Sequence, residues 1–280
     1  MDLYAGQKIA LLTQHGKERV IGPTLEPHLG CEVTLVTGYD TDQLGTFTRD
    51  TPRPGTQREA ARRKARIGME LSGLPIGLAS EGSFGPDPMT GMFQWNIELL
   101  VLIDDRFASE IVAVAQGPAQ SGHLLTDDWS ALEAFARDED FPKHQMVIRP
   151  DNQYDPRIWK GIADWQQLRQ CFDDCRAQSA NGQVFIETDL RAFANPTRMR
   201  RIQEAAANLL DRLKSSCPVC QHPGFWVVER EAGLPCGACG TPTGIYRAEV
   251  RECPSCHHRE RGPRLDLTIA DPANCPRCNP

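Results

Sequence analysis

Apolar and polar residues follow two different periods along residues 8–214. Short apolar runs are typical of buried strands, and apolar residues three or four positions apart are typical of helices. The runs predict strands at 8–12, 31–36, 74–79, 95–103, 110–115, 145–148 and 184–187. The helical spacing predicts helices at 57–72, 127–137, 164–177 and 196–214, and a helix within 17–29 interrupted by two prolines. Strands and helices interleave, which predicts an α/β fold.

Residues 55–91 combine the clearest of these elements. Thr56 and Glu59 form a capping-box pattern at the start of the helix, and Ala61, Ala65 and Gly68 give that helix a small-residue face suited to close packing. The strand at 74–79 is expected to end in a Gly/Pro-rich loop that opens with Ser80, Glu81 and Gly82. Carboxyl ends of strands are where α/β proteins place binding and catalytic groups, so we expect a site here.

The last 64 residues contain eight of the eleven cysteines, arranged as four Cys-x-x-Cys pairs. Eight thiolates at this spacing predict two tetrahedral four-cysteine zinc sites, and four copies exceed what a redox site needs. A module this small has a limited core, so bound metal would supply folding energy. The sequence predicts two domains, 1–213 and 214–280. The predicted metal ligands are Cys217, Cys220, Cys236, Cys239, Cys253, Cys256, Cys275 and Cys278.

How the four pairs combine is open in the sequence. We prefer sequential pairing, which would give a double zinc ribbon, but the spacing also permits an interleaved arrangement, or one that joins the middle pairs and the outer pairs. From residue 214 onward, eight Lys/Arg and seven Asp/Glu give a formal charge of +1, which favours a protein partner over nucleic acid. Phe225, Trp226 and Tyr246 could stack on bases, but such residues more often pack a ribbon hairpin.

The overall charge of −6 argues against a dedicated nucleic-acid-binding protein. No apolar run is long enough to cross a membrane, and the first residues lack the features of a signal peptide. We therefore expect a soluble cytoplasmic protein without a membrane partner.

The turn after the first predicted strand is a candidate anion site. A phosphate-loop motif is absent, because Leu11 and Glu18 occupy positions that require Gly and Ser/Thr. A strand ending in Thr13, a turn at Gly16 and a lysine at a helix start, Lys17, would still attract an anion through backbone amides and charge. The alternative is a simple turn with a surface lysine.

Glu59 and Glu81 are candidate ligands for a hard cation such as Mg²⁺, which takes one or two carboxylates together with substrate phosphates. Each has a simpler explanation. Glu59 would close the capping box and pair with Arg63, and Glu81 would be a solvated loop carboxylate.

Taken in order, three segments resemble the inosine-triphosphatase and Maf superfamily of nucleoside-triphosphate pyrophosphatases. That family opens with a strand and Thr/Ser-x-Asn-x-x-Lys, continues with a helix reading T-F-E-E-N-A-x-x-K-A, and then has a strand ending in acidic residues and glycine. The counterparts are 13–17 (TQHGK), 56–65 (TQREAARRKA) and 78–83 (LASEGS). The whole chain is also similar to an uncharacterised bacterial family of unknown function.

The superfamily resemblance implies a mixed-sheet, pyrophosphatase-like domain at 1–213. It also implies a Mg²⁺-dependent hydrolase of a nucleoside triphosphate or a related phosphorylated small molecule. By the same resemblance, Lys17 and Lys64 would contact phosphate, and Glu59 and Glu81 would be Mg²⁺ ligands or a base. The other implied substrate contacts are Thr13, His15, Arg191 and Arg198. The alternative function is a non-catalytic protein that binds a nucleotide or a partner and uses its zinc ribbons for protein or nucleic-acid recognition.

Overall fold

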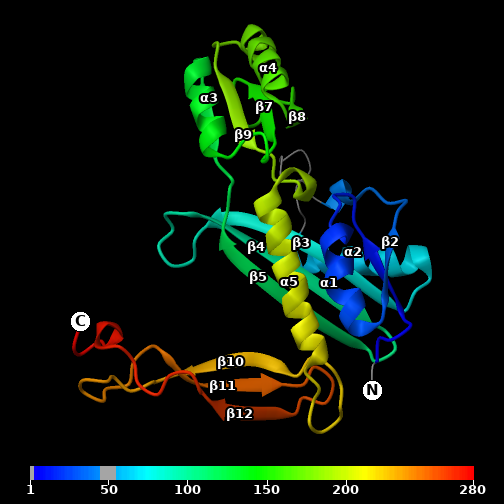
Figure 1. The fold of residues 1–280 in the computed structure, drawn as a ribbon, viewed down its shortest axis with the longest axis vertical. Coiled ribbons are helices and arrows are strands. Elements are labelled where there is room, and N and C mark those ends of the chain that lie inside the picture. The colour runs from blue at the N-terminus through cyan, green and yellow to red at the C-terminus, as the bar shows by residue number, and fades with distance from the viewer. Residues whose placement is uncertain (1–2, 45–54) are drawn as a thin grey trace. The chain divides into compact units, whose positions relative to one another are not determined.

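A computed structural model describes residues 3–44 and 55–280, and the chain divides into two compact units (Figure 1). The first unit comprises 1–106 and 112–210, and the second comprises 107–111 and 211–280. Each unit is described by itself below. In the described part of the chain, no helix combines the length and apolarity needed to span a membrane.

The larger sheet of the first unit has five strands in the order β2-β1-β3-β4-β5. Strand β1 runs parallel to both β2 and β3, and β3 runs antiparallel to β4. The sheet is therefore mixed, and the α/β prediction is confirmed. The strands are β1 (Lys8–Leu12), β2 (Glu32–Val36), β3 (Ile76–Pro86), β4 (Gln94–Asp104) and β5 (Ser109–Pro118).

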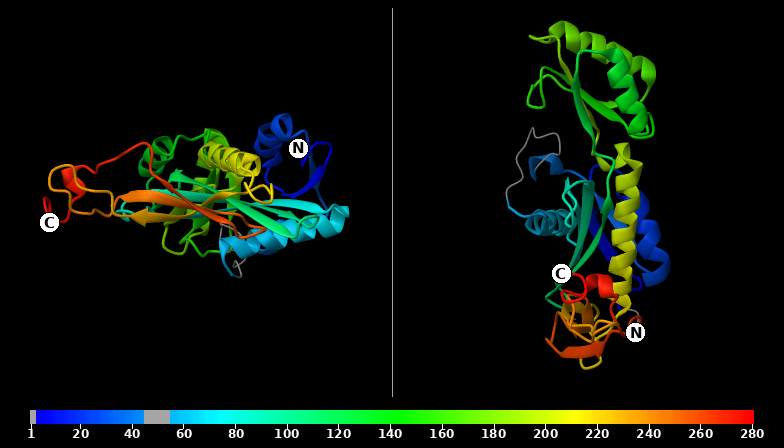
Figure 2. Two further views of the ribbon diagram at one scale, coloured as in Figure 1. Left: turned by 90° about the horizontal axis from the view of Figure 1, so that it is seen from below. Right: turned by 90° about the vertical axis from the view of Figure 1, so that its left-hand side faces the viewer.

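Helices α1 (Glu18–Leu29) and α2 (Gln57–Ser72) cover opposite faces of this sheet, and α5 (Pro196–Lys214) lies on the α1 face (Figure 2). The small-residue face of α2 packs as predicted: Ala61 and Ala65 contact Ala79 of β3. Helix α1 continues through both of its prolines, so the predicted interruption is wrong. Burial of its apolar side against the sheet outweighs the cost of interior proline.

Strand β3 is longer than its sequence suggested. We predicted that it ends at Ala79, but it continues to Pro86 and pairs with β4 along its whole length. Ser80, Glu81 and Gly82 therefore lie inside a strand, and the predicted loop begins only after Pro86. The partner strand supplies the backbone hydrogen bonds that overcome the weak strand propensity of this glycine-rich segment.

The first unit also contains a smaller sheet in the order β6-β9-β7-β8, which packs against two helices. Asp128 and Asp164 cap these helices through their carboxylates. Strands β6 and β8 are too short to give a sequence signal. The elements are β6 (His123–Thr126), α3 (Trp129–Asp138), β7 (Met146–Pro150), β8 (Trp159–Ile162), α4 (Trp165–Gln178) and β9 (Val184–Thr188). Short 3-10 helices span Thr41–Leu44 and Ala192–Ala194.

The second unit is a three-stranded antiparallel meander in the order β10-β11-β12. Its strands are β10 (Trp226–Ala232), β11 (Tyr246–Glu252) and β12 (Arg259–Pro263), and a 3-10 turn follows at Pro272–Asn274. Phe225 is buried and stacks on His258, so it packs the module instead of facing solvent.

Strand β3 contains two glycines with opposite steric surroundings, which makes the close packing of α2 testable. A Cβ at Gly77 would lie 2.7 Å from the backbone oxygen of Ala65, whereas a Cβ at Gly85 meets no atom within 4 Å. We expect Gly77→Ala to lower the free energy of unfolding by about 1–3 kcal/mol through overpacking, and Gly85→Ala to change it by about 0.5 kcal/mol or less. Urea unfolding measures both; equal effects would contradict this account of the helix–sheet contact.

Candidate anion-binding site and cysteine metal centres

The candidate site begins in the turn between β1 and α1. Lys17, at the start of α1, is buried, and its Nζ donates hydrogen bonds to the backbone oxygen of Ser80 at 2.8 Å and to the Ser80 hydroxyl at 3.4 Å. The alternative of a surface lysine is therefore wrong. Thr13 is also buried, and its hydroxyl accepts a hydrogen bond from the His15 backbone amide.

Positive charges surround His15. The pKa of His15 is lowered to about 3, mainly by burial and then by the charges of Lys17, Arg198, Arg191 and Lys64, in that order of importance. His15 is therefore neutral at physiological pH and can both donate and accept a hydrogen bond. Its ring also makes an edge contact with Phe193.

The pKa of Lys17 is also lowered. Burial is the main cause that lowers its pKa, to about 7, and the charge of Arg198 adds to the effect. Glu98 and Glu81 oppose this shift by favouring the charged ammonium. Lys17 is therefore only partly charged near pH 7, and an arriving anion would favour its protonated form.

Glu81 is buried in β3 and forms an ion pair with Lys64 of α2. The alternative of a solvated loop carboxylate is therefore wrong. Gln57, in the first turn of α2, donates to the Glu81 backbone oxygen at 2.7 Å and to the Ile97 backbone oxygen at 3.0 Å, which fixes α2 to β3 and β4.

A second buried ion pair joins α5 to β4. Arg198 Nε donates to Glu98 Oε1 at 2.8 Å, and both side chains are almost completely buried. Asn96 donates to the same carboxylate oxygen at 3.1 Å. A Cβ at Gly82 would lie 2.6 Å from Arg198 Nη2, so this pair requires glycine at the facing position of β3. Glu98 was missed by the sequence reasoning, although a lone carboxylate within the apolar run of β4 is a signal for a buried, paired charge.

Arg191 follows β9 and forms an ion pair with Asp189, which is completely buried. Its guanidinium also lies 4.7 Å from the centre of the Phe193 ring. The charge of Arg191 lowers the pKa of His15, as do the charges of Lys17, Lys64 and Arg198. The structure therefore brings these predicted residues into one charged region. The sequence reasoning did not identify Asp189.

Glu59 is placed differently. Its carboxylate accepts hydrogen bonds from the backbone amide and hydroxyl of Thr56, and Thr56 in turn caps the Glu59 amide. The side chain is exposed, and these hydrogen bonds lower its pKa. The capping box accounts for Glu59 completely.

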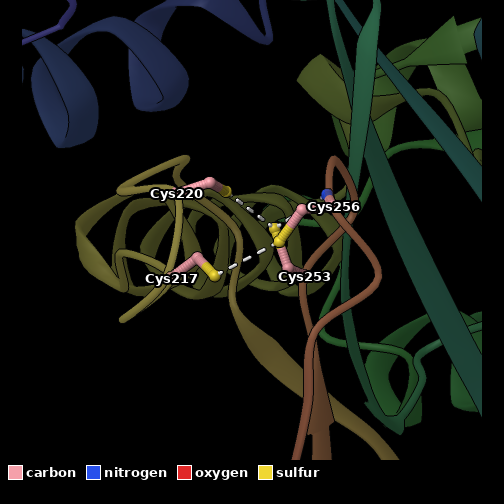
Figure 3. Close-up of side chains that lie close together, drawn as sticks. All are labelled: Cys217, Cys220, Cys253 and Cys256. Carbon is pink, nitrogen blue, oxygen red and sulfur yellow. Dashed lines mark hydrogen bonds between the residues drawn. The ribbon is translucent and has the colours of Figure 1, made fainter.

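The cysteines of the second unit form two tetrads, each with Sγ atoms within 4.8 Å of one another. The Sγ atoms of Cys220 and Cys253 lie 3.5 Å apart, and those of Cys239 and Cys275 lie 3.6 Å apart. Tetrahedral zinc with Zn–S bonds of about 2.3 Å requires sulfur atoms roughly 3.8 Å apart. The thiolates therefore fit structural zinc, and Figure 3 shows the first tetrad converging on one point.

The tetrads are interleaved, so the preferred sequential pairing is wrong. Cys217 and Cys220 join Cys253 and Cys256, whereas Cys236 and Cys239 join Cys275 and Cys278. The meander explains this arrangement. Antiparallel pairing places Trp226, at the start of β10, beside Glu252, at the end of β11, and places Ala248 of β11 beside Pro263, at the end of β12. The first and third cysteine pairs thus meet at one end of the strands, and the second and fourth meet at the other.

All four cysteine pairs share one backbone hydrogen bond. The amides of Gln221, Gly240, His257 and Asn279 each donate to the carbonyl of the first cysteine of their pair, four residues earlier. Gln221, Gly240 and His257 also have positive φ. Within the third pair, the Ser255 amide also donates to Cys253 Sγ at 3.4 Å. These turns hold the thiolates in place for the metal.

Comparison with known families adds one match. The family described as "Domain of unknown function (DUF6671)" matches residues 64–280. The chain belongs to this family. The match includes Lys64, Glu81, Arg191, Arg198 and all eight clustered cysteines, whereas Thr13, His15, Lys17 and Glu59 lie before it. No curated protein and no solved structure matches the chain.

The buried state of Lys17 predicts a pH-dependent stability. Its pKa falls from 10.5 to about 7 on folding, so between these values the unfolded chain binds more protons and stability rises with pH. We expect the unfolding free energy of the wild type relative to Lys17→Met to increase from about pH 7 towards pH 10.5. Urea unfolding across this range measures it, with Lys8→Met as the exposed-lysine control. A difference that does not change with pH would contradict a buried, neutral Lys17.

Double substitutions test the interleaved tetrads. The double variant Cys217→Ser, Cys253→Ser removes two ligands from one tetrad and leaves the other intact. One of the two zinc ions should therefore remain bound after treatment with a chelator. Cys217→Ser with Cys236→Ser damages both tetrads, so neither ion should resist. Zinc content after chelator treatment measures both variants. Sequential pairing would give the opposite result.

Proposed function

We propose that the first unit binds a nucleoside triphosphate or a related phosphorylated small molecule and hydrolyses it with Mg²⁺. The observation that carries the proposal is the group of four basic residues, Lys17, Lys64, Arg191 and Arg198, whose charges lower the pKa of the half-buried, neutral His15. Glu81, Glu98 and Asp189 each pair with one of these cations and hold it in place.

The position of the group in the fold supports the same proposal. Strand β1 lies between β2 and β3, and the connections that leave β1 and enter β3 use helices on opposite faces of the sheet. This arrangement opens a crevice at the carboxyl end of β1, where α/β proteins bind ligands. The turn that contains His15 and Lys17 directly follows this end of β1.

The phosphate contacts follow from the ion pairs. Lys17 would bind phosphate in its protonated form, and Lys64 would bind phosphate while it remains beside Glu81. Arg198 is anchored by Glu98 and by the backbone oxygen of Leu190, so its position is fixed before a ligand arrives. Fixed positive groups stabilise phosphate charge without reorganisation during the reaction.

For the metal, we propose Glu81 as the protein ligand and assign Glu59 to helix capping. Mg²⁺ is commonly held by one or two carboxylates together with substrate phosphates. Among the described residues, the cysteine tetrads are the only groups of three or more potential ligands, which is consistent with a cation that arrives with its substrate. Bound Mg²⁺ would activate a water molecule and offset phosphate charge.

The alternative is a protein that binds the nucleotide, or a partner, without catalysis. It is favoured by one observation: Glu81 and Glu98 are both already paired with cations. We further propose that the cysteine module contacts a protein, because its formal charge of +1 would fall to about −3 with two zinc ions held by eight thiolates, which suits nucleic acid poorly. Eight thiolates available for zinc favour a reducing compartment such as the cytoplasm.

Pyrophosphate release from a panel of nucleoside triphosphates, with and without Mg²⁺, tests the proposed activity. We expect Mg²⁺-dependent release, reduced at least about 100-fold by Glu81→Gln because the proposed carboxylate ligand of Mg²⁺ is lost. Glu70→Gln, at an exposed position of α2, is the matched control.

Full activity of Glu81→Gln would contradict the assigned role of Glu81. Nucleotide binding without release of pyrophosphate would support the non-catalytic alternative.

A further inference from the structure

A pocket lies beside the charged region, at the carboxyl ends of the parallel strands β1 and β2. Its volume is ≈ 360 Å³, and its lining includes Thr13, Glu18, Leu35, Thr37 and Tyr39. This volume falls within the range of small-molecule pockets. Neither the sequence reasoning nor the family match identifies it.

The walls of the pocket are held together without a ligand. Gln14 follows β1, and its side-chain oxygen accepts hydrogen bonds from the amide and hydroxyl of Thr41, at 3.2 and 3.1 Å. Its side-chain nitrogen donates to the backbone oxygen of Tyr39 at 3.2 Å. One side chain thus joins the loop after β1 to the loop after β2, so the pocket is largely pre-formed.

The chemistry of the lining suits a nucleoside. Tyr39 packs on the apolar cluster of Ala10, Leu12 and Val36, which supports its aromatic ring, and Leu35 exposes 43% of its surface. Together they offer an apolar surface for a base. Glu18 offers a carboxylate, which accepts hydrogen bonds from ribose hydroxyls in other α/β proteins. Among the described residues, the lining itself includes no lysine or arginine, and Arg19 lies next to it, with its Nε 3.9 Å from Glu18 Oε1.

Five consecutive residues connect the pocket to the charged region. Thr13, Gln14 and Gly16 line the pocket, Lys17 belongs to the group of cations, and the charges of that group lower the pKa of the neutral His15. A ligand with an uncharged, aromatic end and a phosphate end can therefore contact both places through one turn of the chain.

We propose that this pocket binds the nucleoside part of the ligand whose phosphates lie among Lys17, Lys64, Arg191 and Arg198. The inference rests on the proposed function and specifies its substrate class: the protein selects a nucleotide over an inorganic polyphosphate. Tyr39 and Leu35 contact the base, and Glu18 contacts the ribose.

Equilibrium binding to the full chain tests this assignment, with non-hydrolysable analogues of the four common nucleoside triphosphates and with inorganic tripolyphosphate as probes. We expect at least one nucleotide analogue to bind about 10-fold more tightly than tripolyphosphate, which is the order expected for a stacking contact.

Two variants of the pocket extend this test. Thr37→Trp fills the pocket from an exposed position, and Leu35→Gln removes apolar surface. Both should weaken nucleotide binding about 10-fold and leave tripolyphosphate binding unchanged. Leu71→Gln, at an exposed position of α2, is the matched control.

The outcomes separate the two proposals. If nucleotides and tripolyphosphate bind equally, or if the pocket variants weaken both or neither, the nucleoside pocket is wrong and the charged phosphate site remains. If neither probe binds to the wild type, both proposals are wrong. If nucleotides bind selectively through the pocket but no pyrophosphate is released, the pocket is supported and the hydrolase proposal fails.

Discussion

Strand β3 continues beyond the end of β1, and the candidate site depends on this difference in length. The two strands pair only as far as Leu78, whereas β3 continues to Pro86. Beyond that point the edge of β3 needs side-chain partners, since a buried backbone oxygen without a hydrogen bond is costly. The Lys17 ammonium meets this need at Ser80. The amine is thereby buried near Glu81 and Arg198, and this burial lowers the pKa of Lys17. The pKa of His15 falls mainly through the burial of its own ring, and Lys17 is the largest of the charges that add to the effect.

Backbone pairing also determines the metal centres of the second unit. An antiparallel meander brings together the first and third of four successive turns, and likewise the second and fourth. A cysteine pair at each turn must therefore form interleaved tetrads. The strands fix which thiolates meet, and bound metal would in turn fix the strands, because a module with so little apolar core gains much of its folding energy from its ligands.

The sequence predicted the elements whose signals are local. Strand β1 and helix α5 have the predicted bounds, and the capping box at Thr56 places the start of α2 correctly. Features that depend on pairing between distant segments were missed or wrong. The extension of β3 through Glu81 requires β4, the burial of Glu98 requires Arg198 from a helix 100 residues away, and the cysteine pairing requires the meander. Local periodicity contains no information on such contacts.

The central claim is that the charged region at the carboxyl end of β1 binds the phosphates of its ligand. A crystal structure of the protein with Mg²⁺ and a non-hydrolysable nucleoside triphosphate analogue tests it most directly. The account predicts phosphate oxygens within hydrogen-bond distance of Lys17 and Lys64, with the cation beside Glu81. The claim is contradicted if the analogue binds elsewhere and no phosphate oxygen lies within hydrogen-bond distance of Lys17 or Lys64. Lys17 would then still donate to Ser80, and Lys64 would still pair with Glu81 alone.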